Sequence, residues 1–200
     1  MIATAAVLAG GLGTRLRPAV GDRPKVLAPV AGRPFVAHLL DRLDAAGVRR
    51  VVLLTGHRAG EVRARLGTRH GGMGLAYSEE PAPLGTGGAL RLAWPHLDAP
   101  TVLLLNGDSY CGLNVKALTA FHRRRGAGVS MALVRVDDAG RYGRVQTAGG
   151  RVTAFAEKQG PGRPGWINAG VYLIERRLVE AIPAGQPVSL ERDLLPAWVA

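Results

Sequence analysis

The sequence predicts an α/β fold built on a mostly parallel sheet that is flanked by helices. In the first half, apolar runs of strand length alternate with helical segments, at residues 2–8, 51–55, 75–77 and 102–105. This alternation is typical of βαβ units, whose strands run parallel. The 200 residues and their 47% hydrophobic content are sufficient for one domain with a sizeable core.

Four helices are expected between and after these strands. The first begins near Pro34, because proline suits the first turn of a helix, and it ends at Gly47. One face of this helix carries the apolar residues Phe35, Leu39, Leu40 and Leu43. The remaining helices are predicted at residues 60–66, 87–93 and 115–125.

The second half of the chain has a different pattern. Its apolar stretches are shorter, at residues 129–136, 144–147, 152–156 and 167–174. They predict a smaller region of sheet and hairpins that closes over the first half. We therefore expect a single domain over residues 1–200, with a first part at 1–125 and a second part at 126–200.

Charge and composition narrow the classes of partner. A net charge of +11 suits nucleic acid or a small anionic substrate. Because no aromatic residues interleave with the dispersed arginines, we expect no nucleic-acid partner. Cys111 is the only cysteine, which excludes an internal disulfide and a cysteine-based metal cluster.

The sequence contains no stretch of 18 apolar residues and no secretory leader. We therefore expect no membrane association and a cytoplasmic location. The histidines lack metal-ligand spacing and are assigned to surface or packing roles: His38, His57, His70, His96 and His122. The sequence does not determine the oligomeric state, and a homo-oligomer is one of the alternatives.

A glycine-rich, basic loop follows the first predicted strand. Gly10, Gly11 and Gly13 free the backbone to turn its N–H groups toward an anion, and Arg15 lies at the mouth of this loop. Leu16 stands where a dinucleotide fingerprint needs glycine, and no Gly-Lys-Ser/Thr occurs. The loop is therefore interpreted as a triphosphate-binding loop of neither the Rossmann dehydrogenase nor the Walker type.

Two more loops follow strands. Residues 78–90 place two carboxylates, two prolines and three glycines before a helix, and the run 102–105 ends in Asn106-Gly107-Asp108. Ligands of open α/β sheets bind outside the carboxyl ends of the strands. The loops after Leu8, Tyr77 and Leu105 should therefore share one crevice, where Asp108 is placed to hold Mg²⁺ against phosphate oxygens.

These motifs together resemble those of the sugar-1-phosphate nucleotidyltransferases. LAGGLGTRLRP at residues 8–18 and RPKVLAPVAGRP at 23–34 are similar to the N-terminal signature of that family. Tyr-Gly, Glu-Lys and Asn-Ala-Gly follow in the family's order. The finer resemblance, in PLGTGGAL, LLLNGDSY, WINAGVYL and VSLERDLLP, is to heptose 1-phosphate guanylyltransferases. Mannose-1-phosphate guanylyltransferases and N-acetylmuramate-1-phosphate uridylyltransferases are close competitors.

The resemblance implies a Rossmann-like nucleotidyltransferase fold that moves a guanylyl group from GTP to a sugar 1-phosphate with Mg²⁺. It implies that Glu79 or Glu80 accepts from the donor edge of guanine. The implied nucleotide-binding residues are Leu8, Ala9, Gly10, Gly11, Gly13, Thr14, Glu79, Glu80, Pro81, Gly85, Thr86, Gly87, Asn106 and Gly107. The implied sugar-phosphate-binding residues are Tyr142, Gly143, Glu157, Lys158, Asn168, Ala169 and Gly170. The implied catalytic residues are Arg15, Lys25, Asp108 and Lys158, with Asp108 as the metal ligand.

The sequence departs from the family pattern at its C-terminal end. The resemblance implies a further segment with an aspartate that supplies a second carboxylate to Mg²⁺, whereas this chain ends at Ala200. Either the chain is shortened, or Asp108, phosphates and water hold the metal, or another group substitutes. A nucleotide-binding regulatory subunit without turnover is the alternative from another class.

Overall fold

The computed structural model describes residues 2–11, 13, 21, 23–140, 142–156 and 163–199. Its strands are β1 (Thr4–Leu8), β2 (Pro29–Val30), β3 (Arg33–Pro34), β4 (Arg50–Thr55), β5 (Arg69–His70), β6 (Met73–Glu79), β7 (Thr101–Asn106), β8 (Val129–Val136), β9 (Arg144–Ala148), β10 (Arg151–Ala156) and β11 (Gly165–Glu175). Its helices are η1 (Lys25–Leu27), α2 (Phe35–Ala45), α3 (Ala59–Leu66), α4 (Gly85–Ala93), η2 (Trp94–His96), α5 (Val115–Arg125), α6 (Arg176–Glu180), η3 (Leu190–Leu194) and α7 (Leu195–Val199).

One nine-stranded sheet forms the centre of the described fold, in the order β10-β9-β11-β7-β1-β4-β6-β5, with β8 paired to β11. Strands β7, β1, β4 and β6 are parallel neighbours. The short hairpin β2–β3 forms a separate sheet. The prediction of a mostly parallel central sheet with helices between its strands is confirmed.

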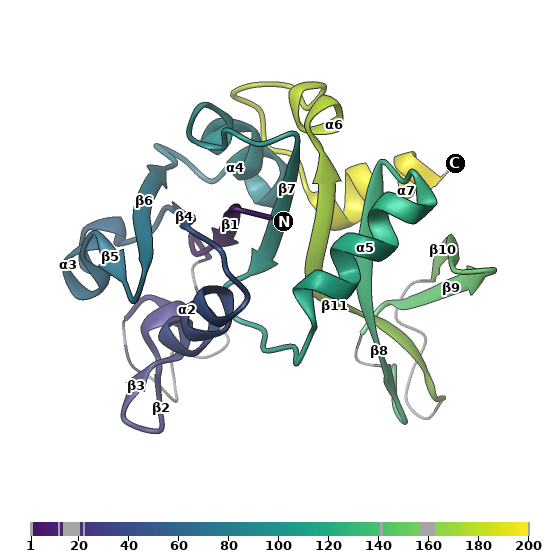
Figure 1. Cartoon of the computed structure of the whole chain (residues 1–200), viewed down its shortest axis with the longest axis horizontal. Coiled ribbons are helices and arrows are strands. Elements are labelled where there is room, and N and C mark those ends of the chain that lie inside the picture. Colours follow the sequence, from purple (N-terminus) through teal and green to yellow (C-terminus); the bar gives the residue numbers. More distant parts are fainter. Residues whose placement is uncertain are drawn as a thin grey trace.

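The sequence pattern predicts that the second half of the chain closes over the first half. The structure shows a different arrangement. Instead, β11 pairs antiparallel with β7 and extends the same sheet sideways, and β8 and the hairpin β9–β10 continue it (Figure 1). The residues from Val171 to Ile174 are all buried, because β11 is covered on both faces. A continuous apolar run of this kind suits a central strand.

Two hydrophobic clusters lie on the two faces of the sheet. Alternate residues of β1 separate between them, since Ala5 and Val7 belong to one cluster and Ala6 to the other. The first cluster includes buried residues of α2, α3 and α5, and the second includes residues of α4, α6 and α7. Helices therefore cover both faces, and the edge at which the parallel strands end is left for the loops.

The helix boundaries follow the expected local signals. Helix α5 spans the predicted residues, with the Asn114 side chain accepting from Ala117 N–H at 3.1 Å at its start and Gly126 at its end. Helix α4 begins at Gly85, two residues before the predicted start. In α2 the stripe residues are buried except Phe35, which is only half-buried. Within the described residues, no helix is long and apolar enough to cross a membrane.

A polar network joins α5 to the strands beneath it. Glu175 Oε1 accepts from Thr101 Oγ1 at 2.9 Å and from His122 Nε2 at 3.0 Å, and His122 Nδ1 lies 2.9 Å from Ser130 Oγ. A carboxylate can only accept, so the imidazole carries its proton on Nε2. The hydrogen bond from His122 is the main reason that the pKa of Glu175 lies below its ordinary value.

We predict that Glu175→Gln lowers the free energy of unfolding at pH 7 by about 1–2 kcal/mol. The free energy of unfolding of this variant should also decrease less steeply than that of the wild type as the pH is lowered. A depressed carboxyl pKa stabilises the fold fully above the unfolded-state pKa, about 4.3, and this contribution is lost as the pH falls through the folded-state value. Urea unfolding between pH 3 and pH 7 measures the effect. Glu180→Gln, which removes a surface pair with Arg176, is the control and should change little.

Candidate active site

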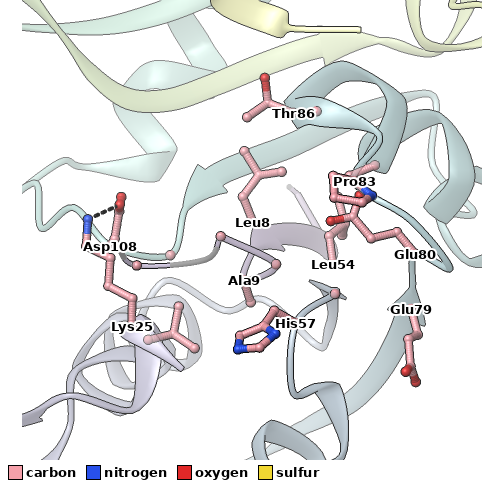
Figure 2. A pocket seen from close by; sticks show the side chains of 18 of the residues that line it. Leu8, Ala9, Lys25, Leu54, His57, Glu79, Glu80, Pro83, Thr86 and Asp108 are labelled. Carbon is pink, nitrogen blue, oxygen red and sulfur yellow. Dashed lines mark hydrogen bonds and ion pairs between the residues drawn. The ribbon is translucent and has the colours of Figure 1, made fainter. Parts of the chain in front are cut away.

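The carboxyl ends of β1, β4, β6 and β7 meet at one edge of the sheet and surround a cavity of about 760 Å³. Its size is that of small-molecule sites. The loops after β1, β6 and β7 line it together, so the predicted shared crevice is confirmed. Figure 2 shows Asp108 and Lys25 at one side of this cavity and Glu79 and Glu80 at the other.

Most of the predicted nucleotide-binding residues line this cavity. They are Leu8, Ala9, Gly10, Gly11, Gly13, Glu79, Glu80, Pro81, Gly85, Thr86, Asn106 and Gly107, together with Lys25 and Asp108. Gly87 is buried and does not line the cavity; its N–H donates to Val188 O at 2.9 Å. Thr14, Arg15, Glu157 and Lys158 lie outside the described residues.

The loop after β4 is a part of the site that the sequence analysis did not assign. Leu54, Gly56 and His57 line the cavity, because β4 is the parallel neighbour of β1 and ends at the same edge. His57 has the exposed position expected of a surface residue, but that surface is the cavity wall. The predicted strand at 51–55 was the available signal. Val26, Ala82, Pro83 and Ala89 complete the unpredicted lining.

Lys25 and Asp108 form an ion pair at one end of the cavity. Lys25 Nζ lies 2.5 Å from Asp108 Oδ2, and about a third of each side chain is exposed, 32% and 38%. Ser109 Oγ donates to the other carboxylate oxygen at 3.2 Å. Lys25 is the first residue of η1, and Asp108 follows β7 by two residues. The pair places one cation and one carboxylate where a charged ligand can contact both.

Glu80 closes the opposite end of the cavity. Its backbone N–H donates to Thr55 O at 2.9 Å, and its Oε2 accepts from Leu84 N–H at 2.9 Å. Its Oε1 lies against Gly10 and Gly56, where an added Cβ would come within 2.8 and 2.6 Å of it. The loops after three strands therefore meet at this carboxylate. In Figure 2, the Glu80 side chain extends toward Pro83 and Leu54, whereas Glu79 extends away.

Asn106 connects the cavity to the predicted sugar-phosphate motif. Its Oδ1 is buried and has no hydrogen-bond partner among the described residues. Its Nδ2 lies against Gly170, so closely that a Cβ there would come within 2.7 Å. Asp108 and Asn106 thus place two kinds of oxygen ligand, a carboxylate and an amide oxygen, at the end of one strand. In the part of the chain that the structure describes, no group of three or more histidine, cysteine or acidic residues could hold a metal.

The remaining described residues of the sugar-phosphate motifs lie outside the cavity lining. Asn168 Oδ1 accepts from Gly170 N–H at 2.8 Å, and its Nδ2 donates to the Tyr172 hydroxyl at 2.6 Å. Ala169 packs against the first hydrophobic cluster. Tyr142 is 51% exposed, and Gly143 lies against the backbone of Ala156. None of the described motif residues belongs to the cavity lining itself.

Comparison with known proteins gives consistent matches. The model of the nucleotidyl transferase family matches residues 4–194. The chain is 41% identical over 198 residues to a mannose-1-phosphate guanylyltransferase of Mycobacterium tuberculosis, covering 98% of this chain and 55% of that protein. It is 35% identical over 191 residues to a D-glycero-alpha-D-manno-heptose 1-phosphate guanylyltransferase of Aneurinibacillus thermoaerophilus, covering 96% and 83%.

The structure is similar to that of HddC from Yersinia pseudotuberculosis, which was solved in complex with GMP-PN. The TM-score is 0.86 at 32% sequence identity, and the match covers 98% of this chain and 86% of that one. The chain spans about half the length of the mannose-1-phosphate guanylyltransferases that it matches, and 55% of the Mycobacterium tuberculosis protein.

We predict that Gly107→Ala destabilises the fold by about 2–3 kcal/mol. A Cβ at this position would lie 2.3 Å from Leu8 O, a backbone atom to which the Gly107 N–H donates at 2.9 Å, so the two strand ends would have to separate. Urea unfolding measures the change. Gly112→Ala is the control, because its Cβ meets nothing within 4 Å. Equal stability of the two variants would contradict this account of the strand ends.

Proposed function

The chain belongs to the nucleotidyl transferase family, and on this premise we propose that it transfers a guanylyl group from GTP to a sugar 1-phosphate and releases pyrophosphate. The acceptor proposed is a heptose 1-phosphate. The observation that carries the proposal is the arrangement of one cavity, with a fixed carboxylate at the end where a base would lie and the Lys25–Asp108 pair at the other end.

Glu80 is the proposed reader of guanine. A carboxylate has acceptor sites on both oxygens, and in Glu80 the Leu84 N–H occupies a site on Oε2 only. Oε1 is held at the cavity wall by the close approach of Gly10 and Gly56. The N1–H and N2 amino group of guanine form a donor edge that such an acceptor can satisfy. Glu79 points away and is not assigned this role.

The proposed reaction needs little covalent chemistry from the protein. An oxygen of the acceptor phosphate attacks the α-phosphorus of GTP, and the bond from that phosphorus to pyrophosphate breaks. No general base is required, because the attacking phosphate is already ionised. Catalysis then depends on positioning and on neutralisation of phosphate charge, which Lys25 supplies within the described residues. The same role for Arg15 and Lys158 stays a prediction from the family resemblance.

Nucleotidyltransferases of this family generally use a divalent metal, and we propose Mg²⁺ for this chain. The Asp108 carboxylate and the unpartnered Asn106 Oδ1 suit it, since Mg²⁺ takes oxygen ligands and leaves further positions to phosphate and water. When bound, the ion would neutralise charge on the phosphates. Asp108 would then exchange its contact with Lys25 for the cation, and the freed ammonium would face the phosphates.

Mannose 1-phosphate is the second candidate acceptor. The 41% identity to a mannose-1-phosphate guanylyltransferase favours it, whereas the motif resemblance of the sequence and the 35% identity to a heptose 1-phosphate guanylyltransferase favour a heptose. Assays with both acceptors distinguish these two alternatives.

We predict that pyrophosphate release with a heptose 1-phosphate is highest with GTP among ATP, CTP, GTP, UTP and dTTP. A site built around a guanine donor edge leaves its own groups unpaired with another base, so the preference should be large. Glu80→Gln should narrow it, and Glu79→Gln is the matched control that should leave it unchanged. A preference for UTP or dTTP would contradict the guanylyl assignment.

Lys25→Ala is expected to lower kcat/KM by about 10²-fold, as removal of one charge-stabilising donor does elsewhere. Lys25→Arg should also impair turnover, because the longer, planar guanidinium cannot reproduce the point contact that the compact ammonium of Lys25 makes with the phosphates. Steady-state kinetics measure both. Lys116→Arg, at an exposed position on α5, is the control. Wild-type rates in both Lys25 variants would overturn the phosphate-contact role.

A further inference from the structure

The segment that leads into η3 lies across the start of α4 and fixes the first turn of this helix, which carries Thr86. Val188 O accepts from the N–H groups of Gly87 and Gly88, at 2.9 and 3.2 Å, and Val188 N–H donates to Leu84 O at 2.8 Å. Leu190 N–H donates to Thr86 Oγ1 at 2.7 Å. A segment more than a hundred residues away in sequence therefore sets the position of a cavity-lining side chain.

Glu191 lies at the centre of this contact. Its Oε2 accepts from Thr86 Oγ1 at 2.7 Å and from Ser189 Oγ at 3.4 Å, and its Oε1 accepts from the Tyr172 hydroxyl at 3.4 Å. The hydrogen-bond partners of this half-buried carboxylate among the described residues are hydroxyl groups, and in that part of the chain it belongs to no ion pair. Hydroxyl donors are directional, so the carboxylate constrains the rotamers of its partners.

Tyr172 extends the network to the predicted sugar-phosphate motif. Burial raises the pKa of its phenol well above the ordinary value, and the nearby Glu191 carboxylate raises it further. The hydroxyl is therefore protonated at neutral pH, donates to Glu191 and accepts from Asn168 Nδ2 at 2.6 Å. Asn168 Oδ1 is occupied by Gly170 N–H. The amide orientation is thus determined, with one Nδ2 hydrogen left for a ligand.

We propose that Glu191 is a positioning residue of the transfer reaction, whose two carboxylate oxygens hold Thr86 at the wall of the nucleotide cavity and, through Tyr172, Asn168 at the sugar-phosphate motif. This inference rests on the proposed function, which places the two substrates at these two motifs. Glu191 touches neither substrate. It keeps Thr86 and Asn168 at a fixed separation, and this separation matters because in-line transfer requires the attacking oxygen and the α-phosphorus to be aligned.

The test is a set of three single variants with distinct expected changes in KM. Thr86→Val removes the nucleotide-side hydroxyl and should raise the KM for GTP alone. Tyr172→Phe keeps the buried ring, releases Asn168 and should raise the KM for the sugar 1-phosphate alone. Glu191→Gln keeps one acceptor oxygen and should raise both KM values, each by about 10-fold, which corresponds to one charge-assisted hydrogen bond.

A double variant and a control separate positioning from general weakening of the segment. Glu191→Gln combined with Thr86→Val should raise the KM for GTP no further than the larger single effect, because both changes break the same link. Asp193→Asn is the matched control: Asp193 Oδ2 accepts from Ser189 N–H at 2.7 Å in the same turn, without contact to Thr86 or Tyr172. It should leave both KM values within about 2-fold of wild type.

Each outcome decides the proposal. The proposal is overturned if Glu191→Gln leaves both KM values unchanged, if Asp193→Asn has an equal effect, or if the two changes multiply in the double variant. In each of these cases, turnover by the wild-type protein would still support the proposed function. A wild-type protein that forms no nucleotide sugar would overturn the proposed function and this inference with it. If Glu191→Gln does not fold, the two substrate-specific increases in KM still decide, for GTP in Thr86→Val and for the sugar 1-phosphate in Tyr172→Phe. An increase in the KM for both substrates in either variant, or for neither, contradicts a two-sided link.

Discussion

The pairing of β7 on both its edges is the constraint on which the rest of the structure depends. β7 is parallel to β1 and antiparallel to β11, with Leu105 opposite Val7 on one side and opposite Val171 on the other. This register places Asn106 and Asp108 close to the loop after β1 and to the irregular stretch of β11 around Gly170. The ion pair to Lys25 and the contact of Asn106 with Gly170 follow from it.

Hydrogen-bond donors of the protein contact two of the acidic side chains that line the cavity. The chain carries a net charge of +11, yet Glu79, Glu80 and Asp108 line a cavity proposed to hold a triphosphate. Glu80 accepts from Leu84 N–H and Asp108 from Lys25, so the charge of each is partly compensated before any ligand arrives. Glu79 points away. The positive field of the surrounding chain then favours an anionic substrate.

Hydrogen bonds between polar side chains connect the two halves of the chain near the cavity. The apolar clusters run continuously through strands of both halves, so the sheet itself is rigid there. In addition, α4, β11 and η3 are linked by hydrogen bonds between hydroxyl, amide and carboxylate groups. Such groups can be rearranged by a ligand without disturbing the core, which is why loops on a rigid scaffold carry function.

The sequence by itself determined the local structure: the four parallel strands β1, β4, β6 and β7, the helix that Asn114 and Gly126 delimit, and three of the four loops at the cavity. Periodicity, caps and turn residues act over a few neighbouring positions, so they can be read from the chain directly. Tertiary structure alone decided that β11 inserts beside β7, that His57 faces the cavity, that Glu80 and not Glu79 points inward, and that Glu191 joins two distant motifs. These outcomes depend on pairing between residues far apart in the chain, where the whole core selects one arrangement among several with similar local preferences.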